Sequence, residues 1–241
     1  MKHNLKSDID KLVSKGMALE EDINLLKDKP LKELINYLND NNAIIRTSAS
    51  VNLKYYIDRD EICNILLLQL FKEKSLYTKI AICETLQNGD INTASKMINY
   101  VGIIGKNQYK TLPKKISSKK SYPLPRDIIA RTLAKMDITI FNLLLEILAT
   151  DDLIKIYEII DAIGYMAFHN ESLQNKKNLK YIINLMNKYK DDKLLIWKCL
   201  TCLSAFNIEE SKDILNKFLN EYNNEDILFL QAKMSLSILK S

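Results

Sequence analysis

The first residues in this chain that suggest chemistry are acids that recur at regular spacing. Asp151-Asp152 and Asp191-Asp192 are adjacent pairs 40 residues apart, and Asp226 follows Asp191 after 35 residues. Carboxylates that share one cleft can act as general acid and base. Adjacent carboxylates on a helix point in different directions, however, and the spacing puts each acid at a turn before a helix. We therefore expect these aspartates to cap helix N-termini, at about 1 kcal/mol each, and not to catalyse.

Cys199-x-x-Cys202 suggests zinc or redox chemistry. A zinc site of this kind needs a second pair of ligands, and Cys63 and Cys83 lie in other helical segments. His169 has no serine or cysteine nucleophile with a nearby base around it. We therefore expect the cysteines to pack in the core, and we expect neither a metal nor a cofactor.

A phosphate-binding loop of the nucleotide-hydrolase type is absent from the sequence. The segment Gly102-Ile-Ile-Gly105-Lys106 lacks the required spacing and has no preceding strand. With no other catalytic constellation in the chain, the prediction is that the protein is not an enzyme.

The stretch from 91 to 126 is the strongest candidate for a binding element. It contains no acid, and its eight basic residues exceed the formal net charge of +5 of the whole chain, so the remainder is net acidic. Three of the four prolines also lie here, and Tyr109 and Tyr122 lie among its lysines. Long loops in compact folds are usually functional or disordered. The segment is therefore either a ligand-binding loop or a solvated excursion.

Composition points to an all-α protein. Of 241 residues, 47% are apolar, while only five are glycine and four are proline, so few β-turns can form. The N-terminus has no apolar run of signal-peptide length, and the longest uncharged apolar run, Ile138 to Leu145, is too short to span a bilayer. We expect a cytoplasmic monomer with reduced thiols and no membrane contact.

Pairs of helices repeat along the chain. The segment Ile44–Asp58 superposes on Tyr77–Ile91 with an offset of 33 residues, which aligns Arg46 with Lys79. An offset of 80 aligns Arg126 with Arg46. The leucine-like positions of the second helix in each pair are 53, 86, 133, 163, 203 and 236. Two-helix units of this length cannot bury their apolar faces alone and must stack.

This pattern resembles HEAT repeats, the armadillo-type α-solenoids. The residues that carry the resemblance are Ile45-Arg46-x-x-Ala49-x-x-x-Leu53, with Asp58, Asp90 and Asp137 just after the second helices. The resemblance implies an all-α, right-handed α-α superhelix of about six helix pairs. We expect one HEAT-repeat domain over residues 1–241, with N-terminal capping helices over 1–29 and a basic inserted loop over 103–126.

In HEAT solenoids the second helices line the concave face, so the aligned basic residues predict a ladder of positive charge there. The alternative is that each basic residue pairs with a carboxylate of the neighbouring unit. The predicted ligand-binding residues are Arg46, Lys79, Lys106, Lys110, Lys114, Lys115, Lys119, Lys120, Arg126 and Arg131.

Two partners fit such a surface. The first is a protein or peptide segment, in particular an acidic one, held without catalysis on a scaffold. The alternative is nucleic acid, because HEAT-like DNA alkylation glycosylases resemble this chain in length, helical content and basic charge. Those enzymes use tryptophans with an aspartate, whereas this chain has only Trp197. That tryptophan is therefore interpreted as a core or groove-edge aromatic, and the peptide hypothesis comes first.

Overall fold

The computed structural model describes residues 3–117, 119 and 121–239 of the chain. Within these ranges it contains fourteen α-helices and three short 3-10 helices and has no strand. The all-α class expected from the composition is therefore confirmed. The chain divides into two compact units, Met1–Tyr100 and Val101–Ser241, and each is described by itself.

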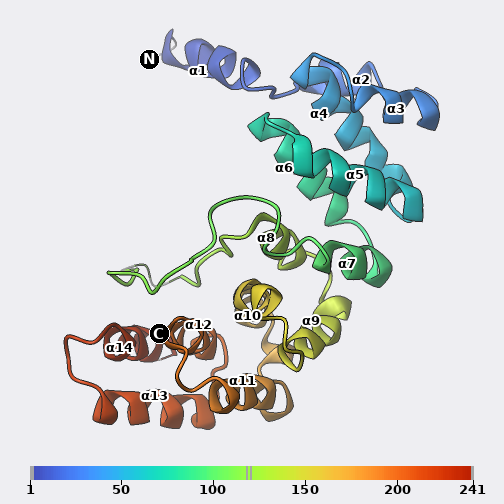
Figure 1. Ribbon diagram of the computed structural model, residues 1–241. Helices are drawn as coiled ribbons and strands as arrows, with labels where there is room; N and C mark the ends of the chain where they lie inside the picture. Colours follow the sequence, from blue (N-terminus) through green and yellow to red (C-terminus); the bar gives the residue numbers. More distant parts are fainter. Residues whose placement is uncertain (1–2, 118, 120, 240–241) are drawn as a thin grey trace. The chain divides into compact units, whose positions relative to one another are not determined.

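Unit 1 holds seven of the described α-helices. They are α1 (His3–Val13), α2 (Glu20–Asn24), α3 (Leu31–Tyr37), α4 (Ala43–Asn52), α5 (Asp60–Lys72), α6 (Leu76–Leu86) and α7 (Ile91–Ile98), with a 3-10 turn, η1 (Leu53–Tyr56), after α4. Helix α4 packs against α2 on one side and α6 on the other, while α5 contacts α6 and α7 (Figure 1). Alternate helices thus form neighbouring rows, as expected for stacked helix pairs.

Unit 2 repeats this alternation. Its elements are α8 (Ile128–Leu133), η2 (Ile138–Ile140), α9 (Phe141–Leu148), α10 (Leu153–His169), η3 (Glu171–Leu173), α11 (Lys176–Lys188), α12 (Lys193–Leu203), α13 (Glu209–Glu221) and α14 (Ile227–Leu239). Helices α8, α10, α12 and α14 contact one another in that order, and we call them the B row (Figure 1). Helices α9, α11 and α13 each pack on the helix that follows them. This packing is consistent with a solenoid.

Short polar side chains start the B-row helices where the sequence predicted them. Asp152 accepts a hydrogen bond from the Lys155 backbone N–H at the start of α10. Asp192 does the same for Leu195 in α12, and Asp226 lies just before α14 and accepts from Leu228. The capping prediction is confirmed, because each carboxylate satisfies a backbone donor that the first helical turn leaves unpaired.

The cysteines lie in the core, as predicted. All four are buried, and burial raises the pKa of the Cys199 and Cys202 thiols well above the usual range. Thiols of this kind are poor nucleophiles and poor metal ligands. No group of three or more His, Cys, Asp or Glu side chains is arranged to hold a metal ion in the described residues.

Among the described residues, no helix combines the length and apolar character that crossing a bilayer requires.

Candidate functional site

The basic loop connects α7 to α8 and is closed at its base by one buried carboxylate. Asp127 caps α8 by accepting from the Ala130 backbone N–H at 2.8 Å. Its other oxygen accepts from the Gly102 backbone N–H at 3.1 Å and from Gln108 Nε2 at 2.7 Å. The two ends of the loop are therefore held by the residue that starts α8. Gly102 has a φ of +76°, a left-handed conformation that favours glycine at the turn where the loop leaves α7.

Arginine side chains add further hydrogen bonds across the base. The Nε of Arg126 donates to the carbonyl of Asn107, and the guanidinium lies over the ring of Tyr109, 4.3 Å from its centroid. Arg131 Nε donates to the Pro125 carbonyl at 2.8 Å. Arg126 thus links the segment around Tyr109 to the residue just before the cap of α8.

The far part of the loop is anchored on helix α10 by Tyr122. This side chain is buried, and its ring lies 5.7 Å from that of Phe168. A Cβ on Gly164 would collide with the Tyr122 hydroxyl, so the tyrosine fits only because position 164 lacks a side chain. A glycine inside a helix costs about 1 kcal/mol relative to alanine. Here it makes room for the loop.

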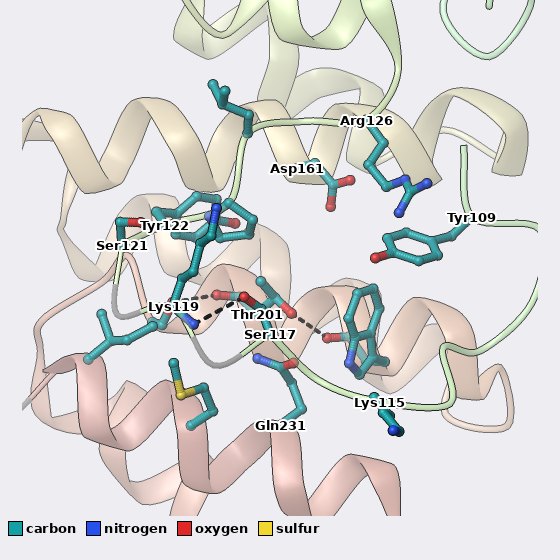
Figure 2. A pocket seen from close by; sticks show the side chains of 16 residues that line it. Tyr109, Lys115, Ser117, Lys119, Ser121, Tyr122, Arg126, Asp161, Thr201 and Gln231 are labelled. Carbon is teal, nitrogen blue, oxygen red and sulfur yellow. Dashed lines mark hydrogen bonds between the residues drawn. The ribbon is translucent and has the colours of Figure 1, made fainter. Parts of the chain in front are cut away.

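A pocket lies between the loop and the B row of unit 2. Its volume is about 440 Å³. The loop contributes one wall and helices α10, α12 and α14 the other, as Figure 2 shows. Its lining residues are Tyr109, Lys115, Ser117, Lys119, Ser121, Tyr122, Pro123, Leu124, Arg126, Asp161, Trp197, Thr201, Ser204, Gln231, Met234 and Ile238.

Two aromatic rings meet at one side of this pocket. Tyr109 of the loop packs edge-on against Trp197 of α12, with centroids 5.1 Å apart and an interplanar angle of 75°. Trp197 is only 8% exposed. Its indole Nε1 is buried and has no hydrogen-bond partner in the described part of the chain. Buried polar groups are normally paired, so an unpaired indole N–H beside a pocket suggests a ligand acceptor.

A buried charge cluster borders the same pocket. Lys198 of α12, fully buried, lies with its Nζ 2.7 Å from Asp161 Oδ2 and 3.7 Å from Glu158 Oε1. One cation thus serves two carboxylates. Burial, only partly offset by Lys198, raises the pKa of Glu158 to about 7, and it raises the pKa of Asp161 as well. Figure 2 shows Asp161, Arg126 and Tyr109 directed toward a common space.

Three of the predicted loop residues line the pocket, namely Lys115, Lys119 and Arg126. Lys106, Lys110 and Lys114 are exposed, and no ion pair involves them among the described residues. Lys120 lies outside the described residues. The loop therefore folds over the B row of unit 2, with part of its charge at the pocket and part in solvent.

The predicted register of the basic ladder is wrong at Arg126. Arg46 is the fourth residue of α4 and Lys79 the fourth of α6, but Arg126 lies before the cap of α8. Asp127 sets the start of α8, so Arg131 is the residue that occupies the fourth position. The 80-residue offset failed because the inserted loop ends later than the alignment assumed.

The Arg46 side chain is hydrogen-bonded to other residues of unit 1. Its Nε and Nη2 donate to the two carboxylate oxygens of Glu73 at 2.8 Å each, and Nη1 donates to the carbonyls of Asp40 and Asn41. The side chains of Arg46 and Glu73 are 16% and 2% exposed. The alternative interpretation, pairing with a neighbouring carboxylate, is confirmed for Arg46. Lys79, which is half-buried, makes no ion pair with the described residues.

Sequence reasoning missed the acidic side of the pocket. Asp161 and Glu158 are the acids of the apolar helix α10, and Lys198 lies in the apolar run of α12. Ionisable residues that interrupt a buried pattern were the available signal, because such groups are rarely buried unless paired. His169, by contrast, is exposed and contacts the rings of Tyr165 and Phe168.

Comparison with known proteins assigns this chain to no family. No protein-family model, curated protein or solved structure matches the chain.

Proposed function

We propose that this protein binds nucleic acid through the basic loop and the pocket of unit 2, and that it catalyses no reaction on it. One observation carries the proposal: Lys115, Lys119 and Arg126 share a pocket with Tyr109 and Trp197. Proteins that hold nucleic acid strands combine cations for the phosphates with aromatic rings for the bases.

The charge of the loop is available to an external anion. The lysines at 106, 110, 114, 115 and 119 are exposed, and no described carboxylate forms an ion pair with any of them. Several exposed lysines without an ion pair among the described residues favour a polyanion, whose binding releases condensed counterions.

The loop is also held in place, which suits binding. Its ends are tied by Asp127 and its far part by Tyr122. Less conformational entropy is lost when a ligand binds to cations whose backbone is already ordered.

An acidic peptide is the second candidate. It is favoured by the pairing of Arg46 with Glu73, which removes one member of the basic ladder. Leu124, Met234 and Ile238 also give the pocket apolar lining that would suit a peptide side chain. Nucleic acid is preferred because peptide carboxylates do not bring planar rings to Tyr109 and Trp197.

For the architecture, we propose a single HEAT-repeat domain and a monomer. The alternating helix rows within each unit support this proposal. A reducing, cytoplasmic setting fits cysteines that are all buried and form no disulfide in the described structure.

Salt titration of oligonucleotide binding tests the proposal. The test variant replaces four loop lysines by alanine: Lys114, Lys115, Lys119 and Lys120. Binding of a labelled 12-nucleotide single strand is measured by fluorescence anisotropy from low to high salt. The slope of log K against log salt is expected to fall by about 2–3 in the variant, since each lost phosphate contact removes about 0.7. The melting temperature should not change, because loop charges contribute little to folding.

A matched control variant removes the same number of positive charges from a different part of the surface. The control variant replaces four exposed lysines on or beside α11 and α12: Lys177, Lys180, Lys190 and Lys193. It should bind like the parent protein. Equal binding by the loop variant and the parent would contradict the proposal, whereas binding of polyglutamate but not of the oligonucleotide would favour the peptide candidate.

A further inference from the structure

The pocket has the size of a small-molecule site. Its 440 Å³ lies within the range of about 300–1,000 Å³ that is usual for ligand pockets. A duplex cannot enter such a space, whereas one nucleotide of a strand can. The phosphates on either side would remain outside, near the exposed lysines of the loop.

We propose that this pocket receives one unpaired nucleobase of a bound strand. The inference rests on the proposed function and adds to it the class of substrate, which is single-stranded nucleic acid or an unpaired position in a duplex. A base in a duplex must first be unstacked and unpaired, a step that a single strand avoids.

Planar groups are available for stacking. The ring of Tyr109, the indole of Trp197 and the guanidinium of Arg126 lie together, since Arg126 covers Tyr109 at 4.3 Å and Tyr109 meets Trp197 at 5.1 Å. Flat groups of these types are the surfaces on which unpaired bases stack in single-strand binding proteins.

A hydrogen-bond donor and a hydrogen-bond acceptor both border the pocket. Trp197 Nε1 is a buried donor without a partner among the described residues, and the Asp161 carboxylate is an acceptor that receives a hydrogen bond from Lys198. Leaving the indole N–H unpaired is unfavourable, because a buried donor has lost its hydrogen bond to water. The edge of a nucleobase carries donors and acceptors side by side, so one base can satisfy both groups. An aliphatic peptide side chain satisfies neither.

The decisive comparison is between a strand with bases and the same strand without them. One probe is a 12-nucleotide single strand, and the other replaces its four central nucleotides with abasic sugars, so that both carry the same phosphates. If the pocket holds a base, the abasic strand should bind roughly 5–150-fold more weakly, as expected when stacking on one base is lost. A duplex of the same sequence should also bind more weakly than the single strand.

Trp197 reports on its own pocket because it is the only tryptophan in the chain. The intact strand should change its intrinsic fluorescence, whereas the abasic strand should not. Tyr109→Ala should reduce binding of the intact strand to the level of the abasic strand and leave abasic binding unchanged. Tyr109→Phe keeps the ring and should retain binding. Tyr55→Ala, which removes a 65% exposed tyrosine from unit 1, is the matched control.

The results separate this inference from the function on which it rests. If both strands bind equally, with the same salt slope and no change in Trp197 fluorescence, the base pocket is excluded while nucleic-acid binding stands. If neither strand binds, the proposed function and this inference are both overturned.

Discussion

Two buried ion groups, one in each unit, differ in how completely they are satisfied. In unit 1, Arg46 and Glu73 form a two-point pair at 2.8 Å, and Gln69 Nε2 and the backbone N–H groups of Lys74 and Ser75 also donate to Glu73. In unit 2, Lys198 alone serves Asp161 and Glu158, and Glu158 Oε2 has no partner in the described residues.

The pKa values follow from this difference. Burial by itself would raise the pKa of Glu73, but the hydrogen bonds from Arg46, Ser75, Gln69 and Lys74 outweigh it and lower the value to about 2. For Glu158 burial prevails, and the pKa rises to about 7. A saturated carboxylate stays charged, whereas one that is incompletely satisfied is near its titration point at neutral pH.

The comparison distinguishes an ion pair that stabilises the fold from a charge cluster that lies beside a candidate site. Every donor of the Glu73 group is supplied within unit 1, which leaves no role for a ligand. The Lys198 group borders a pocket, and ionisable groups that are incompletely satisfied beside a pocket are typical of functional positions. Arg46 was a predicted ligand-binding residue because of its positive charge. Charge alone does not distinguish a structural ion pair from a ligand-binding group.

The largest expected effect comes from breaking the pair in unit 1. Glu73→Ala leaves the Arg46 guanidinium without its carboxylate and should lower the free energy of unfolding by about 3–5 kcal/mol. Combining Arg46→Met with Glu73→Leu should cost less than Glu73→Ala, because no unpaired charge remains. Urea denaturation followed by circular dichroism measures both.

The surface pair Lys29–Glu33 is the control for this experiment. Its side chains are 42% and 47% exposed, so Glu33→Ala should change stability by less than about 1 kcal/mol. A loss of that small size in Glu73→Ala would contradict the architectural role of the Arg46 pair.

A smaller effect is expected at Glu158, and it depends on pH. Its folded pKa of about 7 lies above the ordinary value of 4.5, so between these values the folded state binds the extra proton. Stability should therefore fall as pH rises from about 5 to 7.5, by at most about 3 kcal/mol. Glu158→Gln removes this titration and should flatten the slope and stabilise the protein above pH 7.

Urea denaturation at a series of pH values from 5 to 8 checks this, with Glu146→Gln as an exposed control on α9. Parallel stability curves for Glu158→Gln and the parent protein would show that Glu158 is not incompletely satisfied in the folded state.

Local signals in the sequence were enough to predict the helices but not the pocket. The spacing of Asp152, Asp192 and Asp226 predicted helix starts because a cap is a contact between neighbours in the chain. The Arg46–Glu73 pair and the Tyr109–Trp197 contact join residues 27 and 88 positions apart. Those contacts depend on how helices and loop pack, which no short motif encodes.

The loop illustrates the same limit. Its basic composition predicted an inserted loop over residues 103–126, and the described residues of that range form no helix or strand. Where it docks is determined by Tyr122 on α10, and the only trace of that in the sequence is the glycine at 164 in the middle of a helix.

That glycine gives the last and smallest prediction, which tests whether the loop is a fixed wall of the pocket. Gly164→Ala places a methyl group where the Tyr122 hydroxyl lies. The tyrosine must move, and the lost packing should destabilise unit 2 by about 1–3 kcal/mol. The melting temperature measures this loss, and weaker oligonucleotide binding should accompany it because Tyr122 lines the pocket.

The effect of Gly164→Ala on stability should change sign when Tyr122 is replaced by a shorter side chain. A Tyr122→Leu background lacks the ring and hydroxyl atoms that an added Cβ at position 164 would meet, so alanine should gain its better helix propensity, up to about 1 kcal/mol. Gly164→Ala should then be neutral or stabilising. If it destabilises both backgrounds equally, Tyr122 does not occupy that space in solution, and the pocket wall that contains Tyr122 is not a fixed part of unit 2. A reversal of sign can arise only from contact between these two residues, because helix propensity is the same in both backgrounds.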